Sequence, residues 1–301
     1  MSPKIRVGLI GAGLMGHGIG KNILARGYPL VVLAHRNRKP VEDLLAKGAT
    51  EAKTPRDMAE RCNLVFVCVT GSPQVEEIVY AENGLLAGLR KGLIIADCST
   101  AEPESTLKIA TAVAARGGHF VDTPMTRTPQ EAEAGKLGLM TGGDKAILDQ
   151  INPVLSCFAD TIVHAGAVGA AHKLKLVNNF LAIGTAAVVA EGMTAAAKAG
   201  VDMQALNDIV IAGGAKSVMF ERLIKVALSD DDSSAKFAIE NAGKDLRYYT
   251  NMTGGLPVVS YIAQAIHQTF LLAEVMGYGK RYIPRMVDFL GEINRVKVRK
   301  T

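Results

Sequence analysis

The sequence predicts an α/β protein in which a doubly wound parallel sheet is followed by an all-α domain. Through the first half of the chain, strand-sized apolar runs alternate with helical stretches, and the connections are short. Beyond Gly166 the chain becomes alanine-rich, and its apolar residues repeat at helical spacing. We therefore expect a sheet domain over residues 1–165 and a helical domain over residues 166–301 that begins with a long interdomain helix.

The first predicted strand, 5–10, leads directly into a glycine-rich turn, and a helix is predicted after it. In a G-x-G-x-x-G turn the first glycine permits a tight bend. The second lets the backbone approach a pyrophosphate, and the third lets the helix pack against the strand. The turn predicts a dinucleotide on the free N–H groups of that helix; the alternative is an ordinary glycine-rich connection. The candidate contacts are Gly11, Gly13, Leu14, Met15 and Gly16.

A basic turn follows the second predicted strand, with the sequence His35-Arg-Asn-Arg-Lys39. NAD-binding domains usually place a carboxylate here for the ribose 2′-hydroxyl, but no Asp or Glu lies between Gly16 and Val41. Arginine binds phosphate through forked, charge-assisted hydrogen bonds. We therefore expect NADP rather than NAD, with Arg36 as the main contact and Asn37 beside it. The alternative is a solvated basic loop.

The composition is typical of a folded soluble protein, with 49% hydrophobic and 21% charged residues among 301. The longest apolar runs are strand-sized, so no membrane span or N-terminal leader is expected. The cysteines at 62, 68, 98 and 157 are scattered, which predicts reduced thiols in a cytoplasmic protein and no metal site. A net charge of +5 with 5% aromatic residues and no Trp argues against a nucleic-acid partner.

Strands are predicted at 5–10, 29–34, 64–69, 92–97, 119–122, 137–141 and 160–163. Helices between the early strands are predicted at 14–26, 40–47, 56–61, 73–80 and 104–116. The second domain is predicted to contain helices at 168–199, 203–212, 216–227, 235–252, 256–275 and 282–293. Ligands of doubly wound sheets bind beyond the carboxyl ends of the strands. We therefore add Val69, Thr70, Ser99 and Thr100, which lie at such ends, to the candidate site.

The long predicted helix carries an apolar stripe formed by Leu174, Val177, Leu181 and Val188. A helix that is apolar on more than one face needs partners on several sides. We expect a second subunit to provide part of its burial, in a homodimer or homotetramer.

Polar residues gather at the start of this helix. Lys175 and Asn179 are four residues apart and share a face, and His172 lies three residues before Lys175 on the same side. A partly desolvated lysine can give and take protons, so Lys175 beside a carbonyl could protonate the alkoxide that hydride transfer creates. Asn179 could bind the same oxygen or another hydroxyl. The alternative is that Lys173 and Lys175 are solvated charges.

Further motifs extend this pattern along nearly the whole chain. They are the segment 8–16, Asp97-Cys-Ser-Thr100, Asp122-Thr-Pro-Met125, 135–143, Lys175-x-x-Asn178-Asn179 and Lys244-Asp-Leu246. In this order they resemble the β-hydroxyacid dehydrogenase family. That family includes 3-hydroxyisobutyrate dehydrogenase, tartronate semialdehyde reductase, glyoxylate/succinic semialdehyde reductase and sulfolactaldehyde reductase.

The resemblance implies an N-terminal Rossmann domain and a helical domain that builds the dimer. It also implies Lys175 as the proton donor, Thr100 beside the nicotinamide and Lys244 closing over the cofactor, with Asn178 and Asn179 at the substrate. The family's basic turn matches Arg36 cleanly and Asn37 only loosely. Lys173 could also be counted as the family lysine, but the four-residue step to Asn179 favours Lys175, as does the similar double lysine of glyoxylate reductases.

The sequence departs from the family at Thr126-Arg127-Thr128, where most members have Ser-Gly-Gly to hold the substrate carboxylate. Thr126 keeps the hydroxyl, whereas Arg127 suggests a sulfonate, a phosphonate or a second carboxylate in the substrate. Sulfolactaldehyde reductases resemble this chain in having Arg-Thr at 127 and 128. The alternative is that Arg127 points to solvent or braces the loop against an acid such as Glu131.

These observations predict NADP-dependent, reversible reduction of a small acid-bearing aldehyde to a hydroxy acid, with Lys175 as proton donor. Candidate substrates are tartronate semialdehyde, succinic semialdehyde, glyoxylate and sulfolactaldehyde. A non-catalytic nucleotide-binding scaffold of the same fold is the alternative, since some family members have lost the lysine. Imine reductases also replace the lysine, which argues against that branch.

Overall fold

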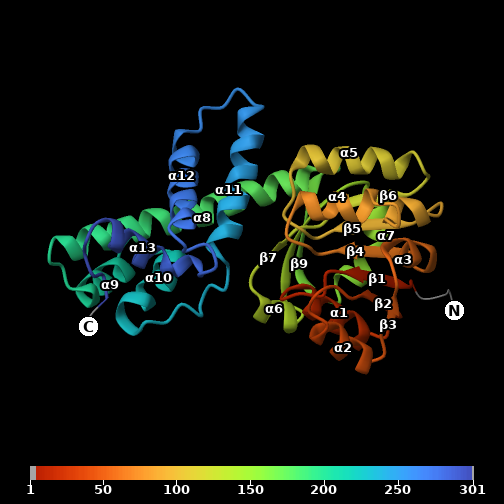
Figure 1. Cartoon of the computed structure of the whole chain (residues 1–301), viewed down its shortest axis with the longest axis horizontal. Helices are drawn as coiled ribbons and strands as arrows, with labels where there is room; N and C mark the ends of the chain where they lie inside the picture. Colours follow the sequence, from red (N-terminus) through yellow and green to blue (C-terminus); the bar gives the residue numbers. More distant parts are fainter. Residues whose placement is uncertain (1–4, 300–301) are drawn as a thin grey trace. The chain divides into compact units, whose positions relative to one another are not determined.

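The computed structural model describes residues 5–299, and the chain divides into two compact units between Lys175 and Leu176. The division falls inside helix α8 (Ala170–Lys198). The first unit is built on a sheet and the second on helices, as the sequence predicts (Figure 1).

The sheet has nine strands in the order β3-β2-β1-β4-β5-β6-β8-β7, with β9 paired to β8. The strands are β1 (Val7–Ile10), β2 (Leu30–Leu33), β3 (Thr50–Ala52), β4 (Leu64–Val67), β5 (Ile94–Asp97), β6 (His119–Asp122), β7 (Met125–Thr126), β8 (Leu137–Gly142) and β9 (Ala159–Gly166). The first six are parallel, and β8 pairs antiparallel with both β6 and β7. The carboxyl ends of β1, β4 and β5 therefore lie side by side at one edge.

Helices cover both faces of this sheet (Figure 1). They are α1 (Gly16–Ala25), α2 (Lys39–Ala46), α3 (Pro55–Arg61), α4 (Ser72–Tyr80), α5 (Pro103–Ala114), α6 (Pro129–Glu133) and α7 (Lys145–Leu155). Successive side chains of a strand point to opposite faces of the sheet, so the sheet has one hydrophobic core on each face. On β4, Leu64 and Phe66 pack with α1, α2 and α7, whereas Val65 and Val67 pack with α3, α4 and α5. The four cysteines are unpaired, and burial raises the pKa of Cys68 to about 12.

Four elements of the first unit were not predicted. β3 and β7 span three and two residues, too few for an alternating pattern to be recognised. α6 is a five-residue helix, and α7 contains Pro153, a residue that usually ends a helix. Buried Leu148, Ile151, Val154 and Leu155 nevertheless hold α7 against the sheet, so tertiary packing outweighs the local preference.

The second unit contains the rest of α8 with α9 (Met203–Ala212), α10 (Val218–Ser229), α11 (Ile239–Gly254), α12 (Tyr261–Val275) and α13 (Met286–Ile293). α8 is long and apolar enough to cross a membrane by length and composition alone. Its buried face, however, belongs to the core of the helical unit through Ile183, Ala186, Ala190 and Met193. It is therefore a core helix.

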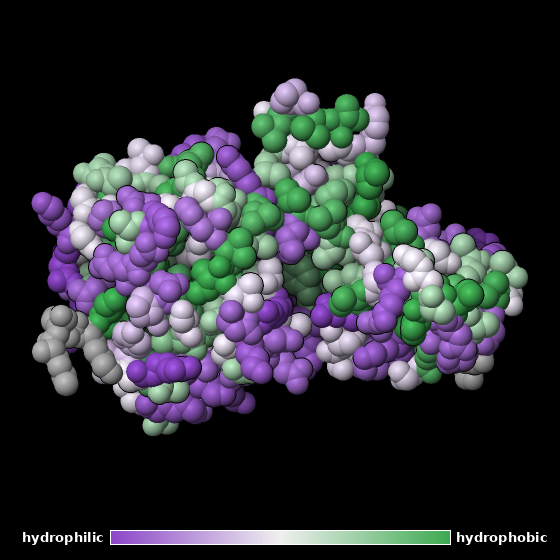
Figure 2. Space-filling model, turned by 180° about the vertical axis from the view of Figure 1, so that it is seen from behind, coloured by the Kyte–Doolittle hydropathy of each residue, from purple (hydrophilic) through white to green (hydrophobic). Residues whose placement is uncertain are grey.

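Another face of α8 is exposed. The predicted stripe of Leu174, Val177, Leu181 and Val188 is accessible to solvent, with Leu181 and Val188 exposed by 62% and 67%. Apolar residues also reach the surface at the tip between α11 and α12, where Figure 2 shows them gathered and where Leu256, Val258 and Val259 lie. Apolar side chains are thus exposed both along α8 and at the tip between α11 and α12.

Candidate active site

The glycine-rich turn joins β1 to α1, and its three glycines have different surroundings. A Cβ on Gly11, whose φ is +97°, would lie 2.1 Å from the Cys68 carbonyl oxygen, and one on Gly16 would lie 2.0 Å from the Gly11 carbonyl oxygen. Both glycines are required by the fold itself. A Cβ on Gly13 would instead meet nothing within 4 Å, and the neighbouring Leu14 is 69% exposed. Gly13 therefore leaves open the space that a pyrophosphate would fill, so the turn fits a dinucleotide.

The basic turn after β2 separates its arginines. Arg38 donates to both carboxylate oxygens of Glu51, at 3.0 and 3.1 Å. Asn37 accepts the backbone N–H of Lys39 at 3.2 Å, which shapes the start of α2. Arg36 is exposed, and within residues 5–299 no side chain or carbonyl hydrogen-bonds its guanidinium. It is therefore available to bind a phosphate.

The loops after β4 and β5 are tied together by Ser99. Its hydroxyl accepts the backbone N–H of Val69 at 3.1 Å, and its own N–H donates to Asp97 Oδ1 at 2.9 Å. Ser99 is buried, Thr70 is exposed and Thr100 is half-buried. The Ser99 hydroxyl thus ties the two loops together, and its expected contact with substrate remains a prediction.

A carboxylate caps the start of α8. Asp122, at the end of β6, accepts the backbone N–H groups of Gly169 and His172 at 2.8 and 2.9 Å. The His172 ring is completely buried, with Nδ1 2.7 Å from Thr106 Oγ1 and Nε2 3.2 Å from the Ser99 carbonyl oxygen. His172 is therefore packed inside the first unit, although it lies only three residues before Lys175. Burial also raises the pKa of the nearby Asp97.

The two lysines of α8 lie in different environments. Lys173 is exposed, whereas Lys175 is half-buried and its Nζ donates to the backbone carbonyl of Met125 at 2.6 Å. Met125 lies on β7, directly before the substrate loop predicted from the sequence. This bond fixes the direction of one ammonium N–H. The geometry agrees with the choice of Lys175 over Lys173.

The other predicted polar residues of the helical unit form a local network. The Asn179 amide donates to Asp245 Oδ2 at 2.6 Å, and the Asn178 amide donates to Asn179 Oδ1 at 3.2 Å. Lys244 lies 2.9 Å from Asp245 Oδ1. Asn179 is thus nearly buried and bonded to an acid on α11. The expected roles of Asn178, Asn179 and Lys244 at substrate and cofactor remain predictions.

Arg127 has a backbone φ of +78°, a region that favours glycine. Its guanidinium contacts Asp160 at 2.9 Å, Thr161 Oγ1 at 3.1 Å and the Lys136 carbonyl. The hydrogen bonds from Arg127 lower the pKa of Asp160. In this structure Arg127 therefore braces its loop against an acid, and the acid is Asp160. Glu131 is not available because it is bonded to Thr128.

The two threonines beside Arg127 also have internal partners. The Thr126 hydroxyl donates to the Gly138 carbonyl at 3.3 Å. Thr128 begins α6 with a capping box, in which its oxygen accepts the Gln130 N–H and Glu131 accepts the Thr128 N–H. The pattern Thr-x-x-Glu at 128–131 could have revealed this cap from the sequence. The Thr128 hydroxyl is thus part of a helix start, and its expected contact with substrate remains a prediction.

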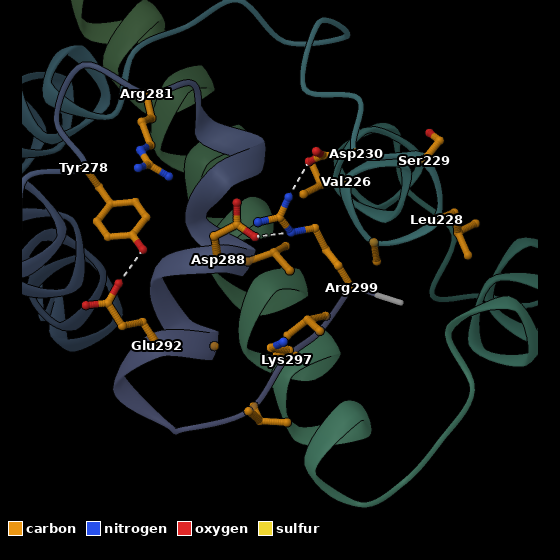
Figure 3. Close-up of a pocket in the computed structure, with 15 residues that line it drawn as sticks. Val226, Leu228, Ser229, Asp230, Tyr278, Arg281, Asp288, Glu292, Lys297 and Arg299 are labelled. Carbon is orange, nitrogen blue, oxygen red and sulfur yellow. Dashed lines mark hydrogen bonds and ion pairs between the residues drawn. The ribbon is translucent and has the colours of Figure 1, made fainter. Parts of the chain in front are cut away.

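The helical unit has a hollow of about 560 Å³, lined by residues of α10, α13 and the segment 296–299 (Figure 3). Its acids are already paired: Asp230 and Asp288 contact both Arg285 and Arg299, and Glu292 accepts the Tyr278 hydroxyl at 2.6 Å. This cluster joins α10 to α13 and the C-terminal segment. We assign it a structural role.

Comparison with known proteins covers nearly the whole chain. Residues 6–166 match the NAD-binding domain of 6-phosphogluconate dehydrogenase, and residues 169–289 match the NAD-binding domain of NADP-dependent 3-hydroxyisobutyrate dehydrogenase. The chain is 27% identical to 2-(hydroxymethyl)glutarate dehydrogenase of Eubacterium barkeri over 99% of both proteins.

Two solved structures are also similar. A 3-hydroxyisobutyrate dehydrogenase from Salmonella typhimurium is 26% identical with a TM-score of 0.85, over 95% of this chain and 100% of that one. Psf3, solved in complex with NADP⁺ and 2-OPP, is 26% identical with a TM-score of 0.83, over 94% of this chain and 99% of that one. Both family matches and both structures agree on a two-domain nicotinamide-dependent oxidoreductase. The chain therefore belongs to the 3-hydroxyisobutyrate dehydrogenase-like β-hydroxyacid dehydrogenase family and is an NAD(P)-dependent oxidoreductase.

Proposed function

We propose that the protein catalyses the reversible, NADP-dependent reduction of a small acid-bearing aldehyde to the corresponding hydroxy acid. The observation that carries this proposal is the position of Lys175 near the start of α8. Its half-buried ammonium donates a hydrogen bond to the Met125 carbonyl, and the chain belongs to a family of hydroxyacid dehydrogenases. The full-length similarity to enzymes favours catalysis over the scaffold alternative.

For the cofactor, we propose that the glycine-rich turn binds the pyrophosphate and that Arg36 binds the 2′-phosphate of NADP. Support comes from the space beside Gly13, from the absence of an acid between Gly16 and Val41, and from the NADP⁺-bound relative. Val69, Thr70 and Thr100, at the ends of β4 and β5, are proposed to face the nicotinamide half. The bound cofactor supplies the hydride.

Lys175 is proposed to donate a proton to the carbonyl oxygen as that oxygen gains negative charge. In the oxidative direction, the same amine accepts the hydroxyl proton. The hydrogen bond to Met125 orients the ammonium beside the predicted substrate loop. Lys173, exposed two residues earlier, supplies no comparable positioning.

We propose that the acid group of the substrate binds at Thr126-Arg127-Thr128. Arg127 would have to exchange Asp160 for the substrate anion. We expect this exchange to be easy, because solvent-exposed ion pairs are weak and these side chains are 35% and 45% exposed. A sulfonate, a phosphonate or a second carboxylate on the substrate would compete best with Asp160 for Arg127. This favours sulfolactaldehyde-like substrates over glyoxylate.

We also propose a homodimer or homotetramer in which the stripe of Leu174, Val177, Leu181 and Val188 is covered by a second copy. The support is that these apolar side chains are exposed in the single chain. Covering them would remove the large apolar side chains that α8 exposes from contact with water.

The test is an assay of the purified protein with NADPH and with NADH, against tartronate semialdehyde, succinic semialdehyde, glyoxylate and sulfolactaldehyde. We expect turnover with NADPH and the lowest KM for the substrate with the strongest acid group. No turnover on any of the four would overturn the proposed function.

A further inference from the structure

The buried ring of His172 is a polar group at the start of α8 that the proposed reaction does not use. It lies three residues before Lys175, so the two side chains are separated by about one helical turn. The ring is inaccessible to solvent and to substrate. Any effect of His172 on catalysis must therefore act through the position of another group.

Both ring nitrogens connect α8 to elements that precede it in the sheet unit. Nδ1 meets the hydroxyl of Thr106 on α5 at 2.7 Å, and Nε2 faces the Ser99 carbonyl at 3.2 Å. Because a carbonyl oxygen can only accept, Nε2 carries the hydrogen in that bond. The Ser99 hydroxyl in turn holds the backbone N–H of Val69. One ring thus links α8 to the loops after β4 and β5.

The backbone of the same residue is held separately. Asp122 at the end of β6 accepts the N–H of His172 and of Gly169, which orients the first turn of α8. The carboxylate sets where the helix begins, and the ring sets its rotation about its own axis. One turn later the Lys175 ammonium reaches the Met125 carbonyl. A rotation of the helix would move this ammonium away from β7.

We propose that His172 is a positioning residue that holds α8 in the rotation at which Lys175 meets Met125 and the reacting carbonyl. This inference rests on the proposed function for its kinetic consequence, whereas the placement of Lys175 can be measured without any substrate. Misplacing a catalytic group by about 1 Å can cost about 10²-fold in rate. That is the size of effect expected here.

The experiment compares His172→Ala, His172→Gln and His172→Asn, with exposed His119→Asn on β6 as the matched control. Gln places an amide N–H near the Nε2 position and keeps the bond to Ser99, and Asn keeps a partner for Thr106. The readouts are kcat, KM and NADPH Kd, together with amine acetylation of Lys175 relative to Lys173 by peptide mass spectrometry. Active-site titration with NADPH corrects for any unfolded fraction.

For His172→Ala we expect kcat to fall about 10²-fold at nearly unchanged NADPH Kd, and the Lys175/Lys173 labelling ratio to rise. The Gln variant should recover most of kcat and of the labelling ratio, and the control should match the wild type. An unchanged labelling ratio in His172→Ala would overturn the proposal. A loss of kcat that is explained by the unfolded fraction, and that His172→Gln does not restore, would overturn it as well. If the wild type reduces no substrate, the proposed function fails while the labelling ratio still decides the role of His172.

Discussion

Arg127 and Asp160 form an ion pair between the loop after β7 and the strand β9, with Nη1 lying 2.9 Å from Oδ2 and 2.8 Å from Oδ1. The pair holds a non-glycine residue at a φ of +78°. The same guanidinium is the group that we propose for the substrate's acid. Asp160 is therefore an internal competitor for the substrate anion.

Replacing Asp160 by Asn should release Arg127 for the substrate. We expect the KM for a sulfonate-bearing aldehyde to fall by up to about fivefold, because an exposed ion pair competes only weakly with the substrate. The KM for glyoxylate should change less. Steady-state kinetics with both substrates are the measurement, and Asp149→Asn, which breaks the exposed Lys145–Asp149 pair, is the control. A higher KM for the sulfonate would show that Asp160 supports the loop instead of competing.

Replacing Lys175 by Ala should abolish proton donation. We expect kcat to fall by about 10²- to 10⁴-fold, the usual contribution of general acid catalysis, with NADPH binding retained. Lys173→Ala is the matched control, because its side chain is exposed two residues away. Turnover by Lys175→Ala near the wild-type rate would show that another group supplies the proton.

Replacing Arg36 by Ala should weaken NADPH much more than NADH, because only NADPH carries the 2′-phosphate. A hydrogen bond to a charged group contributes about 1.5–3 kcal/mol, so Kd for NADPH should rise about 10- to 100-fold. Fluorescence titration with both cofactors measures this. Arg38→Ala, which breaks the pair with Glu51, is the control. Equal losses for the two cofactors would argue against the contact.

Replacing His17 by Gln should lower stability in a pH-dependent way. On α1, the His17 ring lies between Glu133 at 2.5 Å and Asp43 at 2.7 Å. Partial burial acts to lower its pKa, but the hydrogen bonds to both carboxylates outweigh burial and raise the pKa above the usual 6.5. The protonated ring therefore contributes stability that is fully present below pH 6.5 and is lost as the pH rises through the folded-state pKa.

We expect the free energy of unfolding of His17→Gln to differ from that of the wild type by on the order of 1 kcal/mol at pH 6, and by less at pH 9. Urea unfolding at the two pH values measures this difference. His119→Gln, an exposed histidine, is the control. A difference that grew with pH would contradict the assignment of a charged ring.

Replacing Leu181 or Val188 by Glu should break the proposed oligomer, since each would place a charge in an apolar contact. Sedimentation velocity should show the wild type as a dimer or tetramer and the variants shifted toward the monomer. Ile209→Glu on α9 is the control, as an apolar residue that is equally exposed but lies outside the stripe. A monomeric wild type would rule the oligomer out.

The features that could be predicted from the sequence are those whose geometry is local. The conformation of the glycine-rich turn depends on short-range sterics, so Gly11 and Gly16 could be assigned from their spacing. Helical periodicity likewise predicted that Lys175 lies near the start of a long helix and that the apolar stripe runs along one face of it. Alternating strands and helices were sufficient for the fold class, because each element is defined by neighbours within a few residues.

Partners that are distant in the chain could not be assigned in this way. Asp160 lies 33 residues from Arg127, and Thr106 lies 66 residues from His172. The register between β8 and β9 brings Asp160 and Thr161 to Arg127, and the packing of α8 beside α5 buries His172. One-dimensional patterns carry no information on which strand edges or helix faces meet. Spacing therefore sufficed to nominate the candidate lysine and the candidate cofactor turn, whereas chain folding decided which neighbours contact that lysine and which acid Arg127 binds.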